Sequence, residues 1–269
     1  MKDERSNPDV LTPATLTAAL GKAEPMPRLF VHEVLDSTNA EAKRLLLSGE
    51  THPMLVVAER QTAGRGRMGR EFYSPAQTGA YFSVAYVTDA PLSNAVTLTS
   101  AAAVAVMRAV RSLCGIQTSI KWVNDLYLDG RKICGILAES LIGMNGDGRG
   151  RLIIGIGVNL RTRAFPTALS GKAGSLGDEN ITRAALIAEV WRELSPFLRD
   201  PDDCSWLDDY RRHSAVLGKR IRWEQASHAE TGIAVGIDAD GALEVEREGD
   251  ELVRLATGEI SVFCEEEWR

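Results

Sequence analysis

Hydrophobic residues recur along this chain with two periods, and the change of period separates helical from extended segments. Apolar positions three and four apart predict helices in "DSTNAEAKRLLLSGE", in residues 95–115 and in "TRAALIAEVWRELSPFLR". The second of these is apolar almost all round, so we expect it to be buried. Short apolar runs between turn residues predict strands in "RLFVHEVL", "MLVVAE", "AYFSVAYV" and residues 151–160. Because strict strand–helix alternation is missing, we expect an α+β domain with a largely antiparallel sheet, not a doubly wound fold.

Local signals define the ends of two of these segments. Thr38 and Glu41 have the spacing of a capping box at the start of the first helix, and Gly49 marks its end. Asp129-Gly130 lies between two extended runs and is typical of a two-residue hairpin turn.

The pattern changes from about Val216 onward. Short strands joined by turns follow one another, as in "GKRIRWEQ", "ETGIAVGID" and "GALEVERE", which predicts a small β-barrel-like unit. We therefore divide the chain into an N-terminal arm (1–27), a main domain (28–215) and a small β domain (216–269).

Composition and charge exclude several classes of function. The net charge of −6 argues against general attraction to nucleic acid or anionic lipid. The first residues lack the apolar core of a signal peptide, and no run approaches the roughly 20 apolar residues of a membrane span. Neither the four histidines nor the four cysteines have metal-site spacing, and scattered thiols are expected in a reducing cytoplasm: Cys114, Cys134, Cys204 and Cys264.

The segment "QTAGRGRMGREFYSP" (61–75) interleaves Arg65, Arg67 and Arg70 with glycines. The glycines match the GxGxxG dinucleotide fingerprint, but that fingerprint needs a helix to begin at the loop, and "REFYSPAQTG" follows instead. A P-loop is excluded because no GK[ST] follows, and the HRD and DFG motifs of protein kinases are missing. One alternative is a solvated basic loop without a ligand. Mutual repulsion of the guanidinium groups favours anion binding, because an anion relieves the repulsion and backbone N–H groups beside glycine can approach it.

A second cluster of polar residues lies in "KWVNDLYLDGRKICGILAE", on or beside the predicted hairpin. Lys121 faces away from its apolar neighbours, where it contacts a ligand or simply points to solvent. Asn124 and Asp125 contact a ligand or form a local Asx-turn. Lys132 opens the return strand, and Gly135 weakens that strand unless something approaches its backbone closely. The glycines of "GIGVN" permit a close ligand approach or mark a bulge.

Together these segments resemble the biotin protein ligases, which attach biotin to carrier domains of carboxylases. The resemblance covers roughly residues 30–265 in the expected order and rests on "DSTNAEAK", "AERQTAGRGRMGREFYSP", "KWVNDLYLDGRKICGILAE", "GIGVNL" and "GEIS". Two positions depart from the family pattern. Val123 stands where the family usually has proline, and Phe72 stands where it often has tryptophan.

The resemblance implies a catalytic fold like that of class II aminoacyl-tRNA synthetases, followed by an SH3-like barrel. It implies an enzyme that uses ATP and Mg²⁺ to convert biotin into biotinyl-5′-AMP and then transfers biotin to a lysine of a carrier protein, as in acetyl-CoA carboxylase. Residues 1–27 are too few for the DNA-binding domain of bifunctional relatives. We therefore expect a cytoplasmic, ligase-only protein, monomeric or homodimeric, that binds neither DNA nor membrane. The alternatives are a lipoate or octanoate ligase or transferase of the same fold, and a non-catalytic biotin-sensing regulator.

The family pattern, carried onto the matching positions, implies roles for individual residues. Lys132 would bridge the biotin carboxyl group and the α-phosphate, Arg67 would neutralise phosphate, and Asp125 would orient magnesium or the attacking amine; the metal ligands stay unassigned. The implied biotin contacts are Ser37, Thr38, Gln61, Gly64, Arg65, Arg67, Lys132 and Gly135. The implied nucleotide contacts are Arg65, Arg67, Arg70, Phe72, Lys121, Asn124 and Asn159.

Overall fold

A computed structural model describes residues 9–88, 95–141, 149–200, 203–225, 228–256 and 258–262. Cys264, the first eight residues of the predicted arm and the last seven of the small β domain lie outside these ranges.

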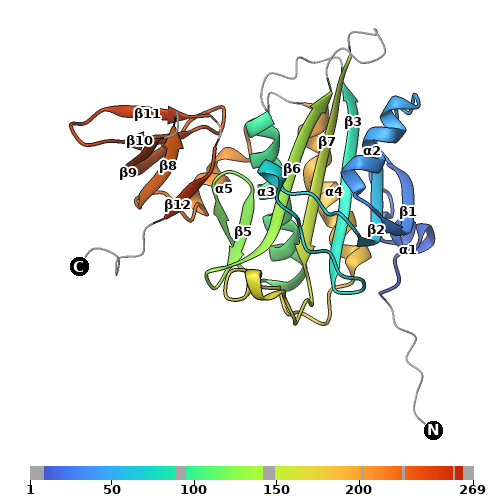
Figure 1. Ribbon diagram of the computed structural model, residues 1–269. Helices are drawn as coiled ribbons and strands as arrows, with labels where there is room; N and C mark the ends of the chain where they lie inside the picture. The colour runs from blue at the N-terminus through green and yellow to red at the C-terminus, as the bar shows by residue number, and fades with distance from the viewer. Residues whose placement is uncertain are drawn as a thin grey trace.

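A mixed seven-stranded sheet forms the centre of the main domain (Figure 1). The parallel pair β1–β2 lies at one edge, and every other neighbouring pair is antiparallel. This confirms the predicted α+β class with a largely antiparallel sheet. Across the sheet the strands are β1 (Arg28–Leu35), β2 (Met54–Gln61), β3 (Gly79–Thr88), β7 (Gly150–Asn159), β6 (Arg131–Leu141), β5 (Asp125–Leu128) and β4 (Ser119–Lys121).

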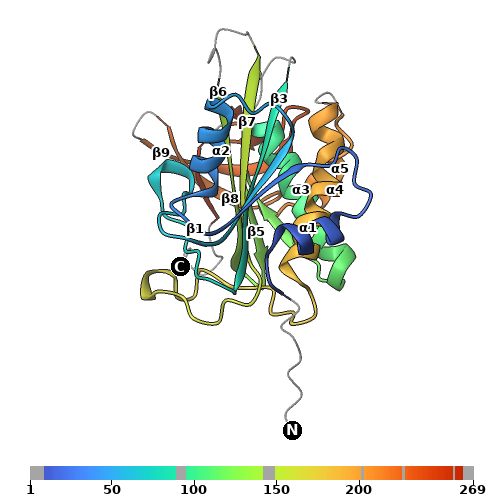
Figure 2. The same cartoon turned by 90° about the vertical axis from the view of Figure 1, so that its right-hand side faces the viewer.

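Helices cover the two faces of the sheet unequally (Figure 2). One face carries α2 (Thr38–Leu47), and the other carries α3 (Ala95–Cys114) and α4 (Arg183–Arg199), with α1 (Pro13–Leu20) packed on α4. Successive side chains of β3 point to opposite faces of the sheet. Phe82 belongs to the core beneath α3 and α4, whereas Ser83 faces α2. The side that α2 covers only in part is therefore open to a ligand.

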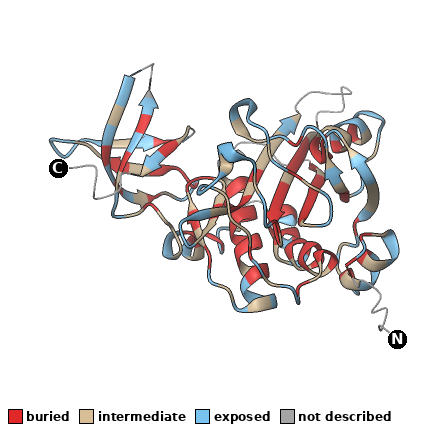
Figure 3. Cartoon of the chain, turned by 60° about the horizontal axis from the view of Figure 1, so that its bottom comes forward, coloured by how far each residue is buried: buried red, intermediate tan, exposed pale blue. Residues whose placement is uncertain are grey.

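The main core lies between the sheet and the helices α3 and α4. Figure 3 shows the buried residues gathered along neighbouring strands and helices in the interior of the main domain. By length and composition alone, Thr97–Cys114 could cross a membrane, but 61% of this window is buried inside the protein. That burial is the pattern of a core helix, as the all-round apolar sequence predicted.

The small β domain is a five-stranded antiparallel sheet that follows α5 (Leu207–Arg212). It docks on the main domain through backbone carbonyls: Trp122 Nε1 donates to Gly241 O (2.9 Å), and Thr97 Oγ1 donates to Asp240 O (2.9 Å). In spatial order its strands are β11 (Leu252–Leu255), β10 (Leu243–Glu246), β9 (His228–Ile237), β8 (Arg220–Gln225) and β12 (Ile260–Val262).

Two local predictions had different outcomes. The hairpin at Asp129-Gly130 is confirmed, because both residues have the positive φ (49° and 72°) of the tight turn. The capping box is wrong, because Ser37 is the N-cap of α2, and Thr38 already belongs to the helix. The Thr38 backbone N–H donates instead to Gln61 Oε1 (2.8 Å). A side chain on β2 therefore supplies the hydrogen-bond acceptor at this helix end, in place of a capping residue of the helix.

Candidate active site

A cavity of about 290 Å³ lies beneath the arginine loop, on the sheet face that α2 leaves open. The loop after β7, with its short 3-10 helix η3 (Thr167–Leu169), and the small β domain complete its wall. The structure brings ten of the predicted site residues to this cavity: Arg65, Arg67, Arg70, Phe72, Lys121, Asn124, Asp125, Lys132, Gly135 and Asn159.

The arginine loop folds back on itself. Gly64 O accepts from Phe72 N–H (2.8 Å) and Gly66 N–H donates to Arg70 O (2.7 Å), around the 3-10 turn η1 (Arg67–Gly69). A Cβ on Gly64 would lie 2.4 Å from Phe72 O, so this position admits only glycine. The glycines thus serve a tight backbone turn that projects the arginine side chains.

Each arginine of the loop has its own partner from another part of the chain. Arg65 Nη1 lies 3.3 Å from Glu139 Oε1, and Arg70 pairs with Glu259 of the small β domain. Within the part of the chain that the structure describes, Arg67 donates to two neutral acceptors, Asn124 Oδ1 (3.1 Å) and Gly258 O (3.0 Å). The charge of Arg67 is therefore not offset by a carboxylate in these contacts.

Lys132 is held by its backbone as well as by its charge. Its N–H donates to Lys172 O (2.9 Å) and its carbonyl accepts from Gly174 N–H (2.8 Å), which ties β6 to the loop after β7. Lys132 Nζ lies 2.7 Å from Asp125 Oδ1 on the neighbouring strand. A Cβ on Gly135 would lie 3.1 Å from Lys132 Cε, so this glycine gives the ammonium arm its room.

The β4–β5 hairpin adds a cation and two polar groups. Lys121 Nζ lies 5.8 Å from the centre of the Tyr127 ring, a cation–π distance. Burial, together with the nearby charge of Asp125, raises the pKa of Tyr127 to about 12, so the phenol stays neutral. Asn124 makes no local Asx-turn, because its amide donates to Ile136 O (3.0 Å) and its oxygen accepts from Arg67.

Four predicted biotin contacts do not border the cavity: Ser37, Thr38, Gln61 and Gly64. Gln61 Nε2 donates to Ser74 Oγ (2.9 Å), and Ser37 and Thr38 are buried beside it at the start of α2. Three further residues meet them there, and sequence reasoning missed all three: Asn39, Ser83 and Glu139. The available signal was a polar residue inside an apolar strand, as Ser83 is in "AYFSVAYV".

The glycines of "GIGVN" make room for side chains of the protein itself. A Cβ on Gly157 would lie 2.4 Å from the Phe72 ring, and one on Gly155 would lie 2.2 Å from Asn39 Oδ1. β7 pairs with β3 and β6 without a register shift, so the alternative of a bulge is wrong. Phe72 borders the cavity and Gly157 does not, so this ring closes the cavity on the side of the buried polar residues.

The side chain of Asn159 is satisfied at one of its two polar atoms. Its Nδ2 donates to Gly174 O (3.0 Å), whereas its buried Oδ1 has no hydrogen-bond partner among the described residues. An unpaired buried acceptor costs about 1–3 kcal/mol, and a ligand donor in the cavity would remove that cost.

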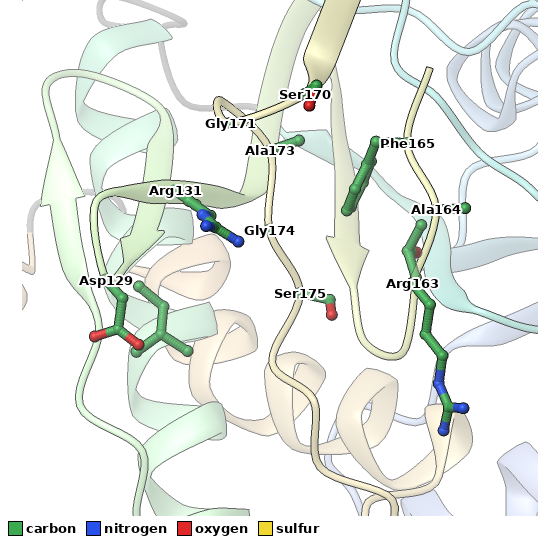
Figure 4. A pocket seen from close by; sticks show the side chains of 12 residues that line it. Asp129, Arg131, Arg163, Ala164, Phe165, Ser170, Gly171, Ala173, Gly174 and Ser175 are labelled. Carbon is green, nitrogen blue, oxygen red and sulfur yellow. The ribbon is translucent and has the colours of Figure 1, made fainter. Parts of the chain in front are cut away.

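A larger, more open pocket of about 800 Å³ lies beyond the cavity, and Phe165 and Ala173 border both. Figure 4 shows its side chains, among them Arg131 and Phe165, on the β5–β6 hairpin and the segment after β7. None of the predicted site residues lines it. The cations converge in the smaller cavity, which is therefore the candidate active site.

No group of three or more His, Cys, Asp or Glu side chains that could hold a metal ion occurs in the described ranges. Cys114 and Cys134 are free thiols. Burial raises the pKa of the Cys134 thiol, which disfavours its thiolate form.

Comparison with known proteins gives consistent matches. Residues 31–159 match the model of the biotin/lipoate A/B protein ligase family, and residues 216–262 match that of the biotin protein ligase C terminal domain. The bifunctional ligase/repressor BirA of Bacillus subtilis is 35% identical over 230 residues, 81% of this chain and 69% of that protein. The biotin–[acetyl-CoA-carboxylase] ligase of Mycobacterium tuberculosis is 31% identical, over 96% of this chain and 94% of that one.

A solved structure shows the same arrangement of elements. The biotin protein ligase from Aquifex aeolicus in complex with biotin and ATP is 26% identical, with a TM-score of 0.74, over 88% of this chain and 99% of that one.

Proposed function

The chain belongs to the biotin/lipoate A/B protein ligase family and is a biotin–[acetyl-CoA-carboxylase] ligase, and we propose that the cavity beneath its arginine loop is where biotin and ATP react. The observation that carries the proposal is the convergence of the loop arginines and Lys132 on one small cavity. Four cations in one place match a reaction that brings a carboxylate to a triphosphate.

In the first step an oxygen of the biotin carboxylate attacks the α-phosphorus of ATP. A carboxyl–phosphate bond forms, the bond to the β-phosphate breaks, and pyrophosphate leaves with the electron pair. Two anions must approach each other, so positive charge has to offset both. We assign Lys132 to the carboxyl and α-phosphate oxygens. We assign Arg67 to phosphate, because its hydrogen bonds to described residues go to neutral acceptors.

In the second step the ε-amine of a carrier lysine attacks the acyl carbon of biotinyl-5′-AMP. An amide bond forms, the acyl–phosphate bond breaks, AMP leaves, and the amine loses a proton. The pair Lys132–Asp125 supports a role for Asp125 here. Once Lys132 turns to phosphate, the Asp125 carboxylate is free to orient the amine.

The protein's own carboxylates hold the cations in place around the cavity. Asp125, Glu139 and Glu259 pair with Lys132, Arg65 and Arg70. Substrate anions would replace Asp125 beside Lys132, and would bind Arg65 and Arg70 where Glu139 and Glu259 hold them. This draws the loop over the adenylate, which also excludes water from a hydrolysable anhydride.

The ligand contacts divide between the cavity and the buried polar residues. We assign the biotin ring to Ser37, Thr38 and Gln61, a position it can reach once the Phe72 side chain moves aside. The unpaired Asn159 Oδ1 supports a nucleotide contact, because an adenine amino group is a donor of the required kind.

Several features of the whole protein are part of the same proposal. Mg²⁺ would arrive with ATP and be held mainly by phosphate and water, since the described residues offer no acidic cluster. The acceptor is a biotin carrier protein or carrier domain in the cytoplasm. Residues 28–215 act as the catalytic domain, and 216–269 as a domain that reaches the cavity through Glu259.

The test combines two assays on the full chain. Biotin, lipoate and octanoate are each supplied with Mg-ATP and pyrophosphate release is measured, and a biotin carrier domain is then examined by mass spectrometry. We expect release with biotin and a carrier heavier by one biotinyl group. Release with lipoate or octanoate alone would assign this chain to the other branch of its family.

A further inference from the structure

Glu139, on β6, uses its two carboxylate oxygens for neighbours in different parts of the fold. Oε1 lies 3.3 Å from Arg65 Nη1 in the arginine loop. Oε2 accepts a hydrogen bond from Asn39 Nδ2 in the first turn of α2 (2.7 Å). One side chain therefore joins the loop above the cavity to the buried polar residues beside it.

The contacts continue from Asn39 to Gln61 as a chain of hydrogen bonds. Ser83 Oγ donates to Asn39 Oδ1 (2.6 Å) and lies 2.8 Å from Thr38 Oγ1, which lies 3.2 Å from Gln61 Oε1. We call Asn39, Ser83 and Thr38 the relay. Their exposed fractions are 3%, 0% and 4%, so water does not compete for these groups.

The relay has a direction that its end groups set. Glu139 Oε2 and Leu137 O can only accept, and Asn39 Nδ2 donates to both, so Asn39 Oδ1 must face Ser83. Ser83 has a single hydroxyl proton and gives it to Asn39. The Thr38 proton must then go to Ser83 Oγ or Gln61 Oε1, and the Thr38 oxygen keeps lone pairs that can accept from a ligand.

We propose that Glu139 is a positioning residue for the ligase reaction: one oxygen holds Arg65 over the cavity, and the other, through Asn39 and Ser83, keeps Thr38 an acceptor for a ureido N–H of biotin. This inference rests on the proposed function. It means that ring recognition and charge neutralisation share one carboxylate. Lipoate and octanoate carry no N–H at the corresponding end, so the relay favours biotin over both.

A double-mutant cycle tests the relay. Glu139→Gln and Thr38→Val are measured singly and together, with the Kd for biotin from calorimetry on the full chain. We expect each change to weaken binding about tenfold, the effect of one lost hydrogen bond of this kind. Because both act on the same contact, the double variant should be much less than a hundredfold weaker. Independent, fully multiplicative losses would overturn the proposal.

Breaking the relay in the middle gives a second measurement. In a Ser83→Ala background the coupling between Glu139 and Thr38 should disappear, whereas Glu139→Gln should still raise the KM for ATP through Arg65. Coupling that persists without the Ser83 hydroxyl would overturn the assigned route. If Glu139→Gln does not fold, Ser83→Ala and Thr38→Val form a cycle that tests the same relay, with multiplicative losses again contradicting it.

Glu259→Gln is the matched control. It removes the same charge beside another loop arginine, Arg70, but lies outside the relay. We expect it to raise the KM for ATP and to change the biotin Kd less than twofold. A loss of biotin affinity equal to that of Glu139→Gln would mean that any carboxylate beside the loop suffices. If the unaltered chain releases no pyrophosphate with biotin, the proposed function fails. If the chain is active but Glu139→Gln and Thr38→Val change the biotin Kd independently, only this inference fails.

Discussion

Replacing Asp9 by alanine should destabilise the whole main domain. Asp9 lies near the start of the chain, far in sequence from the residues that it contacts. Its Oδ1 accepts from the Arg183 backbone N–H (2.6 Å) at the first residue of α4, and its Oδ2 accepts from Arg183 Nε (3.1 Å). Arg161, two residues after the end of β7, pairs with the same carboxylate. Because the Arg183 side chain is only 2% exposed, water cannot replace these partners.

The size of the effect follows from the charge balance of the cluster. Arg161 and Arg183 face two carboxylates, Asp9 and Glu59. Removing Asp9 leaves the largely buried Arg161 without its directly paired carboxylate, with Glu179 and Asp178 acting only from a distance, and breaking a buried pair in this way costs about 3–5 kcal/mol. Glu59 and the Asp9 carbonyl still accept from Arg183, so we expect about 3 kcal/mol, or roughly 6–12 °C in Tm for a chain of this size.

Urea denaturation followed by circular dichroism measures this free energy of unfolding. Asp9→Asn should lose about half as much, because its amide oxygen can still accept from the Arg183 N–H. Glu251→Ala is the control: it breaks an exposed pair with Arg247, with side chains 64% and 33% exposed, and should cost less than about 1 kcal/mol. If Asp9→Ala costs no more than this control, the buried cluster does not hold the N-terminal segment as argued.

Three further predictions concern the site and its surroundings. Lys132→Ala should keep the fold but slow ATP–pyrophosphate exchange about a hundredfold, on the order of 3 kcal/mol of lost charge stabilisation; normal exchange would contradict its assigned role. Gly157→Ala should displace the Phe72 ring, because the added Cβ would lie 2.4 Å from it, and should raise the KM for biotin without unfolding the chain. Burial raises the pKa of Tyr81 to about 12, so the folded state favours the neutral phenol. Stability from Tyr81 is complete below about pH 10 and is lost between about pH 10 and 12, by roughly 2–3 kcal/mol in urea titrations, and Tyr81→Phe should abolish that loss.

Much of the fold could be predicted because its signals are local. Alternating and apolar runs located β1, β2, β3 and β7, and Asp129-Gly130 located the hairpin of β5 and β6. The pattern joined β4 and β5 in one extended run, whereas they are two strands that pair with each other. The N-terminus of α2 could not be predicted in the same way. Thr38 has the sequence of a cap, but Gln61 on a neighbouring strand takes its hydrogen bonds, and strand placement depends on the whole sheet.

The features of the active site also divide into those that local sequence identifies and those that only the fold creates. The sequence alone determined which residues could carry positive charge to an anion, and the motifs around Arg65, Arg67, Arg70 and Lys132 determined the family. Only the tertiary structure decided what these cations touch without substrate. Glu139 and Asn39 are 100 residues apart, and Arg70 and Glu259 are 189 apart. Such contacts form only when packing of a complete core fixes distant strands and helices together, so no local pattern of residue types can specify them.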